Sequence, residues 1–344
     1  MGSRVTIRDV AAIAEVSPAT VSRVLNADER VAPELRMRVL AAVERLGYRP
    51  NSQARSLRTQ ATRVIGLIIS DIQNPFFTSL VRGVEDVAQA SGYSVVLANS
   101  DEDLGKEQQY LRVAAAEQMA GVILSPASSS CTRIGELVHE EIPVVTIDRR
   151  IAADVDSVAV DNVAGARQAV EHLLKTGATR VGIIAGPADV STAADRIEGY
   201  HAALRDAGIA VDPALLVRGD FRIDGGRRAA GRLLDLPAHQ RPDALFAANN
   251  LMLIGTLDAM AERGLTAPAD LLLAGFDEMS WAGFAPPLTL VEQPTYEIGR
   301  LATEMLLRRI SGDTSAAEHI VLDATLKVRA SSDVRPAVRA VSEL

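Results

Sequence analysis

Two hydrophobic periods divide the chain. Between residues 6 and 46, apolar side chains recur every three or four positions, which is the spacing of one face of an α-helix. From about residue 64 onward, short continuous apolar runs such as VIGLII alternate with longer windows of helical period. Continuous runs of this length are typical of strands in a parallel sheet that is covered on both faces. The pattern therefore predicts a small helical head followed by an α/β body.

The head is predicted to contain three helices. Thr6 is placed to cap the first helix, and Ser17 caps a second helix that begins with Pro18. A third helix is expected over residues 33–46. The second helix is short, and no acidic residue occurs between positions 17 and 27. A helix of this kind at the end of a helix-turn-helix fits the major groove of DNA, and the alternative is an ordinary helical hairpin with a solvated face.

The body is predicted to have two similar α/β lobes. Nine apolar runs, which begin at residues 64, 93, 121, 143, 157, 180, 244, 271 and 288, are too many strands for one small doubly wound lobe. A seam near Asp161 divides these runs into two groups. We expect the chain to return to the first lobe after Gln293.

Charge is distributed unevenly between head and body. The formal net charge of the 344 residues is −8, which by itself disfavours binding to nucleic acid. Residues 1–60, however, hold ten arginines against six acidic residues, a net charge of +4, so the remainder carries −12. A basic head on an acidic body is expected when only the head contacts phosphate.

Several classes of protein are disfavoured by what the sequence lacks. Cys131 is the only cysteine, so we expect no disulfide framework and no thiolate metal site. We also expect no cofactor. The N-terminus has no apolar signal-peptide core, and no apolar run reaches the roughly 18 residues needed to cross a bilayer, which predicts a cytoplasmic protein without a membrane partner. No G-x-S-x-G, H-E-x-x-H or Walker sequence is present, and the five histidines lack ligand spacing, so we expect no catalysis.

Polar and aromatic residues come after most of the predicted strands. Ligands of doubly wound sheets bind beyond the carboxyl ends of the strands, so these residues are candidate ligand contacts. Carboxylates and amides pair with hydroxyl groups, arginine donates to oxygen, and aromatic rings cover C–H faces, which together suit a neutral polyol. The candidates are Asn74, Phe76, Phe77, Asp148, Arg149, Arg196, Phe221, Asn249, Asp277 and Gln293.

Two alternatives apply to these candidates. Any single Asp or Asn among them could instead cap a helix or shape a turn, and Phe76 and Phe77 could belong to the core. A phosphate site would favour glycine-rich loops and unpaired cations. In this sequence an acidic residue precedes each candidate arginine, as in Asp148–Arg149 and Asp195–Arg196, which disfavours a phosphate site.

Three runs, RDVAAIAEVSPATVSRVLN, RVAPELRMRVLAAVERLGYRPN and ARSL, resemble the LacI/GalR family of bacterial transcriptional regulators. The resemblance extends to about Ser332. It implies a helix-turn-helix DNA-binding domain at 1–50, a hinge helix and linker at 51–61, and a two-lobed effector-binding and dimerisation domain at 62–332. This last domain is similar to the periplasmic sugar-binding proteins. The boundaries that we expect are about 62–160 and 289–322 for lobe 1, about 161–288 for lobe 2, and 333–344 for a short tail.

The family resemblance implies how the head would bind DNA. The recognition helix reads the major groove and a hinge helix inserts a leucine into the minor groove of a palindromic operator. Arg23 would contact guanine, and Leu57 would wedge a base step, unless Leu57 merely begins the body. The residues expected to contact DNA are Thr6, Ser17, Pro18, Ala19, Thr20, Ser22, Arg23, Asn26, Tyr48, Asn51, Arg55, Leu57 and Arg58.

The resemblance also bears on the effector and on assembly. The ten candidate contacts are similar, residue by residue, to those of ribose-type members of the periplasmic fold, which implies a ribose-like sugar or polyol. Val190 stands where purine-responsive relatives place a polar contact. Wedging by one leucine from each subunit requires a homodimer, and the tail after Ser332 is too short for a tetramer-forming zipper. Glu15 departs from the family at a turn where Gly or Asn is usual, which predicts backbone strain.

Two other functions remain as alternatives. A solute-binding protein that serves transport would share the two-lobed body, but it would carry a signal peptide and lack the basic head. A regulator that responds to a purine or a sugar phosphate would share the whole architecture and differ only in the cleft.

Overall fold

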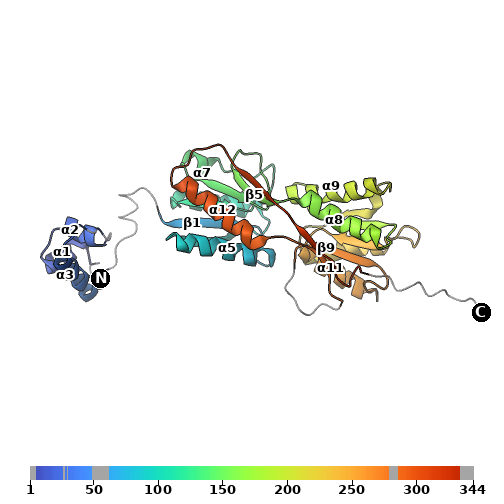
Figure 1. The fold of residues 1–344 in the computed structure, drawn as a ribbon, viewed down its shortest axis with the longest axis horizontal. Helices are drawn as coiled ribbons and strands as arrows, with labels where there is room; N and C mark the ends of the chain where they lie inside the picture. The colour runs from blue at the N-terminus through green and yellow to red at the C-terminus, as the bar shows by residue number, and fades with distance from the viewer. Residues whose placement is uncertain (1–4, 26–27, 29, 49–61, 279–285, 334–344) are drawn as a thin grey trace, which may run out of the picture. The chain divides into compact units, whose positions relative to one another are not determined.

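The computed structural model describes residues 5–25, 28, 30–48, 62–278 and 286–333. These residues belong to two compact units, residues 1–62 and residues 63–344 (Figure 1). The predicted hinge helix and linker at 51–61, and the tail beyond residue 333, lie outside the described residues.

The first unit is built from the three helices that the apolar spacing predicts. They are α1 (Ile7–Ala14), α2 (Pro18–Leu25) and α3 (Pro33–Leu46). One valine from each helix, namely Val10, Val21 and Val39, is completely buried in a shared core. Burying a valine side chain contributes roughly 1.5–3 kcal/mol, so this small core depends on a few residues.

The turn between α1 and α2 contains the strain that the sequence predicts. Glu15 has φ 50° and ψ 48°, a left-handed conformation that side chains other than glycine rarely adopt. Arg38 of α3 donates to the carbonyl oxygen of Ala14 at 2.7 Å and pairs with the Glu15 carboxylate at 3.0 Å. These contacts from α3 offset part of the strain.

The second unit contains two six-stranded sheets. The first sheet has the order β11-β5-β4-β3-β1-β2, and all of its strand pairs are parallel. Its strands are β1 (Val64–Ile69), β2 (Ser94–Asn99), β3 (Gly121–Leu124), β4 (Val144–Ile147), β5 (Asp156–Val160) and β11 (His319–Leu322). Four helices cover this sheet, namely α5 (Phe76–Ala90), α6 (Leu104–Ala116), α7 (Gly135–His139) and α12 (Thr295–Ile310).

Alternate residues of β1 enter different cores. Ile65 and Leu67 pack in the core formed with α5 and α12, whereas Ile68 packs in the core formed with α6 and α7. A strand that is buried on both faces needs apolar residues at every position, which is why the run VIGLII does not alternate with polar residues. We call this sheet with its helices lobe 1.

The second sheet, with its helices, forms lobe 2. Its order is β12-β10-β9-β8-β6-β7, and only β12 is antiparallel to its neighbour within the described strands. The strands are β6 (Val181–Ala185), β7 (Leu216–Arg218), β8 (Ala244–Ala247), β9 (Leu272–Phe276), β10 (Thr289–Glu292) and β12 (Thr325–Lys327). The helices are α8 (Asn162–Lys175), α9 (Ser191–Asp206), the short 3-10 helix η1 (Pro213–Leu215), α10 (Ile223–Leu234) and α11 (Asn250–Ala261). Helices α8 and α9 pack together, as do α10 and α11, and Figure 1 shows the two pairs on opposite sides of the sheet.

The structure corrects one lobe boundary. The prediction that lobe 1 resumes at residue 289 is wrong for β10, because Thr289 and Val291 pair in parallel with Ala274 and Phe276 of β9 in lobe 2. The chain crosses to lobe 1 only after Gln293. Three short strands at the sheet edges, β7, β11 and β12, are not among the predicted runs, because each has only three or four residues and includes exposed positions.

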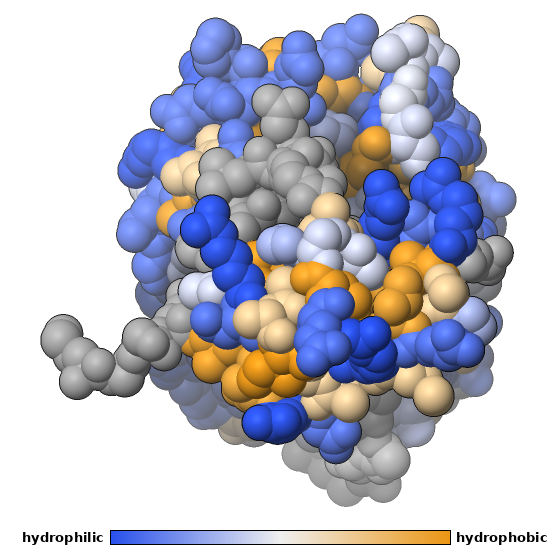
Figure 2. Space-filling view, turned by 90° about the vertical axis from the view of Figure 1, so that its left-hand side faces the viewer, coloured by the Kyte–Doolittle hydropathy of each residue, from blue (hydrophilic) through white to orange (hydrophobic). Residues whose placement is uncertain are grey.

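Hydrophobic residues reach the surface in places. On the face that Figure 2 shows, they are interspersed with hydrophilic residues. Met37 of α3 and Val96 and Leu97 of the edge strand β2 are among the exposed large hydrophobic residues. Within the described part of the chain, no helix is both long enough and apolar enough to cross a membrane.

Candidate ligand-binding cleft and nucleic-acid interface

A cleft lies between the carboxyl ends of the two sheets. It contains about 370 Å³ of space between atoms, a figure that includes open solvent. All ten candidate ligand contacts line it: Asn74, Phe76, Phe77, Asp148, Arg149, Arg196, Phe221, Asn249, Asp277 and Gln293. The lining also includes Ser70, Asp71, Glu102 and Thr192. Residues separated by more than 200 positions in the sequence thus meet at one site.

Some candidates have the structural roles that were the alternative interpretation. Asn249 caps α11 by accepting from the Met252 amide at 2.9 Å, and its side-chain nitrogen donates to the Phe221 carbonyl at 3.1 Å. The Asn74 side chain accepts from the Phe76 amide at 3.0 Å at the start of α5. Phe76 and Phe77 stack edge to face at 4.9 Å and are almost completely buried. These residues therefore shape the cleft as well as line it.

Four lining residues have a left-handed backbone. The φ angles are 55° at Glu102, 65° at Asp148, 63° at Phe221 and 75° at Asp277. Aspartate tolerates this conformation better than most residues, whereas for a bulky residue such as phenylalanine it is a marked outlier. Such conformations cost about 1–3 kcal/mol each and concentrate at functional sites, where the surroundings hold the side chain in one orientation.

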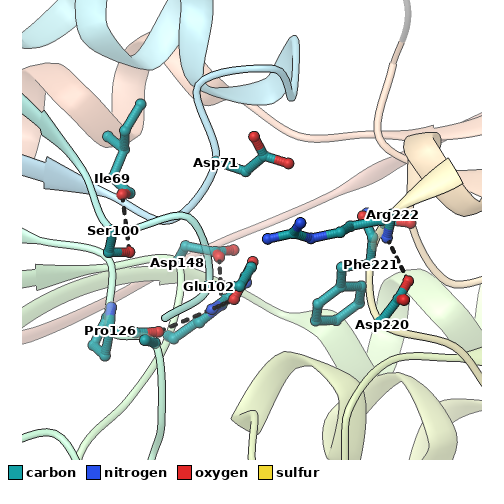
Figure 3. Close-up of polar contacts among 12 residues, drawn as sticks. Ile69, Asp71, Ser100, Glu102, Pro126, Asp148, Asp220, Phe221 and Arg222 are labelled. Carbon is teal, nitrogen blue, oxygen red and sulfur yellow. Dashed lines mark hydrogen bonds and ion pairs between the residues drawn. The ribbon is translucent and has the colours of Figure 1, made fainter. Parts of the chain in front are cut away.

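Arg149 is held by an acid that is distant in the sequence. Its two terminal nitrogens donate to the two carboxylate oxygens of Glu102, at 2.7 and 2.6 Å, and one of them also donates to the Pro126 carbonyl at 2.9 Å. Asp148, the sequence neighbour, contacts only Nε, at 3.4 Å. Figure 3 shows Glu102, Asp148 and Pro126 together, with Phe221 and Arg222 facing them. Adjacency in the sequence therefore does not identify the main partner of Arg149.

Arg196 has a different environment. It donates to Asn162 Oδ1 at 2.8 Å and to the Ala248 carbonyl at 2.5 Å, and its guanidinium lies 3.7 Å from the centre of the Phe276 ring. The neighbouring Asp195 pairs instead with Arg150, at 2.8 Å. Across the described residues, no carboxylate lies within 4 Å of Arg196, although its side chain is 3% exposed. Burial lowers the pKa of Arg196, and the carboxylates of Asp277 and Asp148 oppose this shift from a distance.

Burial also changes the carboxylates of the cleft. It raises the pKa of Asp148 to about 6, against the opposing influence of Arg149 and Arg196. The pKa of Asp277 is likewise raised by burial, while Arg196 and a hydrogen bond from Gln293 Nε2 oppose the shift. A carboxylate that is poorly hydrated and incompletely paired is a strong acceptor for a ligand hydroxyl group.

Two buried oxygens at the cleft have no partner within the described residues. They are Ser70 Oγ and Gln293 Oε1, and both belong to residues that line the cleft. An unpaired buried polar atom costs about 1–3 kcal/mol, so such atoms in a native structure need an explanation. A ligand with several hydroxyl groups would satisfy both.

The two lobes contact each other around the cleft. Asn250 of lobe 2 donates to Asn74 of lobe 1 at 2.8 Å. At the rim, Arg222 of lobe 2 pairs with Asp101 of lobe 1 at 3.2 Å. Because these contacts join opposite sides of the cleft, any change in the angle between the lobes must break or rearrange them.

Four lining residues are not among the ten candidates, namely Ser70, Asp71, Glu102 and Thr192. Ser70 ends the run that precedes Asp71, Glu102 lies after β2, and Thr192 lies in the first turn of α9. The position of Glu102 beyond a strand is a signal of the same kind that identified the other contacts. Two residues, however, separate Glu102 from the end of β2, so adjacency to the strand does not single it out.

The first unit presents most of its candidate DNA contacts to solvent. Ser17, Pro18, Ala19 and Arg23 are exposed at α2, and Thr6 is exposed before α1; Thr20 and Ser22 are partly buried. Tyr48 is partly buried against the helical core, which indicates a packing role as well. The remaining candidates lie outside the described residues: Asn26, Asn51, Arg55, Leu57 and Arg58.

Two segments of the chain match known families. Residues 6–51 match the family described as bacterial regulatory proteins, lacI family, and residues 170–332 match the periplasmic binding protein-like domain.

Curated relatives match nearly the whole chain. A ribose operon repressor of Halalkalibacterium halodurans is 41% identical over 306 residues, which are 89% of this chain and 90% of the relative. The HTH-type transcriptional repressor PurR of Aliivibrio fischeri is 34% identical over 313 residues, which are 89% of this chain and 91% of the relative.

Solved structures are similar along the chain as well. The lac repressor dimer bound to operator and the anti-inducer ONPF has a TM-score of 0.83 at 26% identity, with 96% of this chain and 99% of that chain covered. A LacI family transcriptional regulator from Enterococcus faecium with bound ribose has a TM-score of 0.71 at 28% identity, with 79% of this chain and 99% of that chain covered.

Proposed function

The chain belongs to the LacI family of bacterial regulatory proteins, and we propose that its effector is a small neutral sugar or polyol with the hydroxyl display of ribose. The chain is a transcriptional repressor regulated by a sugar or another effector, and it is not an enzyme, since its curated relatives are named as repressors. A repressor acts where the DNA is, so we place it in the cytoplasm.

One observation carries the proposed effector. The cleft combines carboxylate acceptors with a buried arginine whose hydrogen-bond partners, among the described residues, are neutral. Asp148 and Asp277 would accept from hydroxyl groups, and Arg196 would donate to a hydroxyl or ring oxygen. The rings of Phe77 and Phe221 would cover the C–H faces of a small ring. The names of a ribose operon repressor and of a ribose-bound relative agree with this chemistry.

A purine is the second candidate, and the likeness to PurR favours it. The cleft supports it less well. Val190, at the position where a polar contact would be expected, is buried and does not line the cleft. A flat heterocycle would also leave Asp148 and Asp277 with few donors to bind.

For the DNA, we propose a homodimer on a palindromic operator, with α2 in the major groove. The exposed Arg23 at the end of α2 would contact a guanine, and Leu57 would enter the minor groove. The apolar edge strand β2, with exposed Val96 and Leu97, offers a surface for a second copy. Sugar binding would change the contacts between the lobes and thereby bias the hinge segment.

A thermal-shift titration of the full chain tests the effector. Ribose, other pentoses, hexoses, pentitols, ribose 5-phosphate and hypoxanthine are compared at increasing concentration. A ligand that binds only the native state raises the Tm in a concentration-dependent manner, and we expect this with ribose or a close relative. A shift only with hypoxanthine or only with the phosphate would contradict the proposal while leaving the family assignment unchanged.

The hinge assignment has its own test. Leu57→Ala should weaken operator binding by about tenfold or more, because the wedge helps to hold the bent duplex, while sugar affinity stays unchanged. Operator binding by fluorescence anisotropy and sugar binding by calorimetry separate the two readouts. Equal loss of both would show that the substitution damages the whole protein rather than the hinge.

A further inference from the structure

The lining of the cleft has more negative than positive side chains. Four carboxylates and two guanidinium groups line it, so the charged groups sum to −2 when all are ionised. These groups are Asp71, Glu102, Asp148, Asp277, Arg149 and Arg196. A neutral sugar needs acceptors, but it does not need this excess. One of the four carboxylates has a position that hydroxyl recognition does not explain.

That carboxylate belongs to Glu102. Both of its oxygens accept from Arg149, at 2.6 and 2.7 Å, in the bidentate arrangement that guanidinium groups also form with phosphate. The pair is well enclosed, with 5% of the Arg149 side chain and 15% of the Glu102 side chain exposed. The backbone is held as well, because the Glu102 amide donates to the Ser70 carbonyl at 2.8 Å. Glu102 is therefore fixed in front of the guanidinium edge.

The cleft itself shows that a buried arginine can be held without such an acid. Arg196 is equally buried and is oriented by an amide, a carbonyl and the Phe276 ring. Arg149 also has other contacts, namely the Pro126 carbonyl and, through Nε, Asp148. Glu102 adds a carboxylate that occupies the two terminal nitrogens of Arg149. These donors would otherwise form a site for a phosphate or carboxylate group.

We propose that Glu102 is a specificity-determining residue, which excludes phosphorylated and acidic sugars by occupying and neutralising Arg149. This inference rests on the proposed function, because it concerns the ligand of the same cleft. It accounts for the bidentate geometry and for the net negative lining. A repressor with this device distinguishes a free sugar from the product of its phosphorylation.

Calorimetric titrations of the full-length chain test the proposal. Ribose, ribose 5-phosphate and inorganic phosphate are titrated into the natural protein and into Glu102→Gln, which keeps the side-chain size and removes the charge. We expect no measurable phosphate binding to the natural protein. The variant should gain at least about tenfold in affinity for ribose 5-phosphate or for phosphate, because glutamine is uncharged and offers one acceptor oxygen in place of two to the terminal nitrogens of Arg149.

Asp101→Asn is the matched control. It removes the same charge from the adjacent residue, which also has a left-handed backbone, but Asp101 pairs with Lys106 and Arg222 rather than with Arg149. A gain confined to the Glu102 variant supports direct occupation of the Arg149 edge. An equal gain in both variants would mean that only the overall charge of the region matters, which overturns the proposal.

The other possible outcomes also test the proposed role of Glu102. If Glu102 served only to hold Arg149 in place, its replacement would weaken ribose binding without creating phosphate binding, and that result overturns the proposal. If Glu102→Gln fails to unfold cooperatively, Glu102→Asn is measured instead, since asparagine tolerates the φ of 55°. If the natural protein does not bind ribose, the proposed effector fails, yet phosphate binding by the variant alone still supports the role of Glu102.

Discussion

The two lobes each place a buried arginine at the cleft, and they hold it differently. In lobe 1, Arg149 is neutralised by Glu102 through both terminal nitrogens. In lobe 2, Arg196 is held by neutral acceptors and by the Phe276 ring. Burial alone therefore does not indicate what an arginine contributes. A guanidinium that is paired with a carboxylate of the protein stabilises the fold and, as proposed above, restricts which ligands bind. One that is held by neutral groups keeps its charge for the ligand.

The largest expected effect is on stability, and it distinguishes the buried Arg149–Glu102 pair from an exposed ion pair of the neighbouring Arg150. Arg149→Ala leaves the carboxylates of Glu102 and Asp148 close together without their cation, so the free energy of unfolding should fall by about 3–5 kcal/mol. Urea denaturation measures this change. The neighbouring Arg150 is exposed and pairs with Asp195, so Arg150→Ala should cost less than about 1 kcal/mol. Equal losses of unfolding free energy in the two variants would show that the buried pair of Arg149 contributes no more to stability than the exposed pair of Arg150.

For ligand binding, in contrast, we expect the larger effect at Arg196. Arg196→Ala should lower sugar affinity by about 100-fold, because a hydrogen bond from a charged donor in a dry site is worth about 1.5–3 kcal/mol. Operator binding in the absence of sugar should stay largely intact. Calorimetry with the sugar found by the thermal-shift screen gives the affinity, and anisotropy gives the DNA binding. Normal sugar affinity in this variant would show that Arg196 does not contact the ligand, and the proposed difference between the two arginines would then be wrong.

The pH dependence of sugar binding extends the comparison to Asp148, because both arginines lower the pKa of its carboxyl group against the effect of burial. Its pKa of about 6 means that lowering the pH below 6 protonates the carboxylate, so sugar affinity should fall by up to about tenfold per pH unit. Asp148→Asn should abolish this slope between pH 5 and 8. A slope that persists in Asp148→Asn would assign the titration to another group.

The ligand-free protein should respond in the opposite direction. The folded pKa of Asp148 exceeds the unfolded value of about 3.9, so the folded state binds the proton more tightly. This contribution to stability is fully present below pH 4 and is lost as the pH rises through 6. The stability of Asp148→Asn should lack that component in denaturation experiments across the same range.

The smallest effect is expected at the rim. Arg222 and Asp101 join the lobes by an ion pair in which both side chains are 40% or more exposed. Exposed pairs contribute about 0–1 kcal/mol, so Arg222→Ala should change sugar affinity no more than about fivefold. A loss comparable to that of Arg196→Ala would indicate that closure of the lobes, rather than contacts inside the cleft, limits binding.

Local sequence determines the elements of this protein well. The bounds of α1, α2, α3 and β1 agree with the apolar spacing and the capping residues, because a helix or a buried strand depends on neighbours a few positions away. The ten lining residues could also be predicted, since strands of a doubly wound sheet end at the same edge. The resemblance to a known family then allowed the residues to be chosen individually.

The tertiary structure alone decided which charged groups pair. In the sequence Asp148 is adjacent to Arg149 and Asp195 to Arg196, whereas the structure pairs Glu102 with Arg149 and Asp195 with Arg150. It likewise placed β10 in lobe 2 and formed the short strand β12 against it. The physical reason is the same in both cases. A long arginine side chain or a strand edge binds whichever partner the fold brings within about 3 Å, and that partner is specified by the packing of whole lobes rather than by position along the chain.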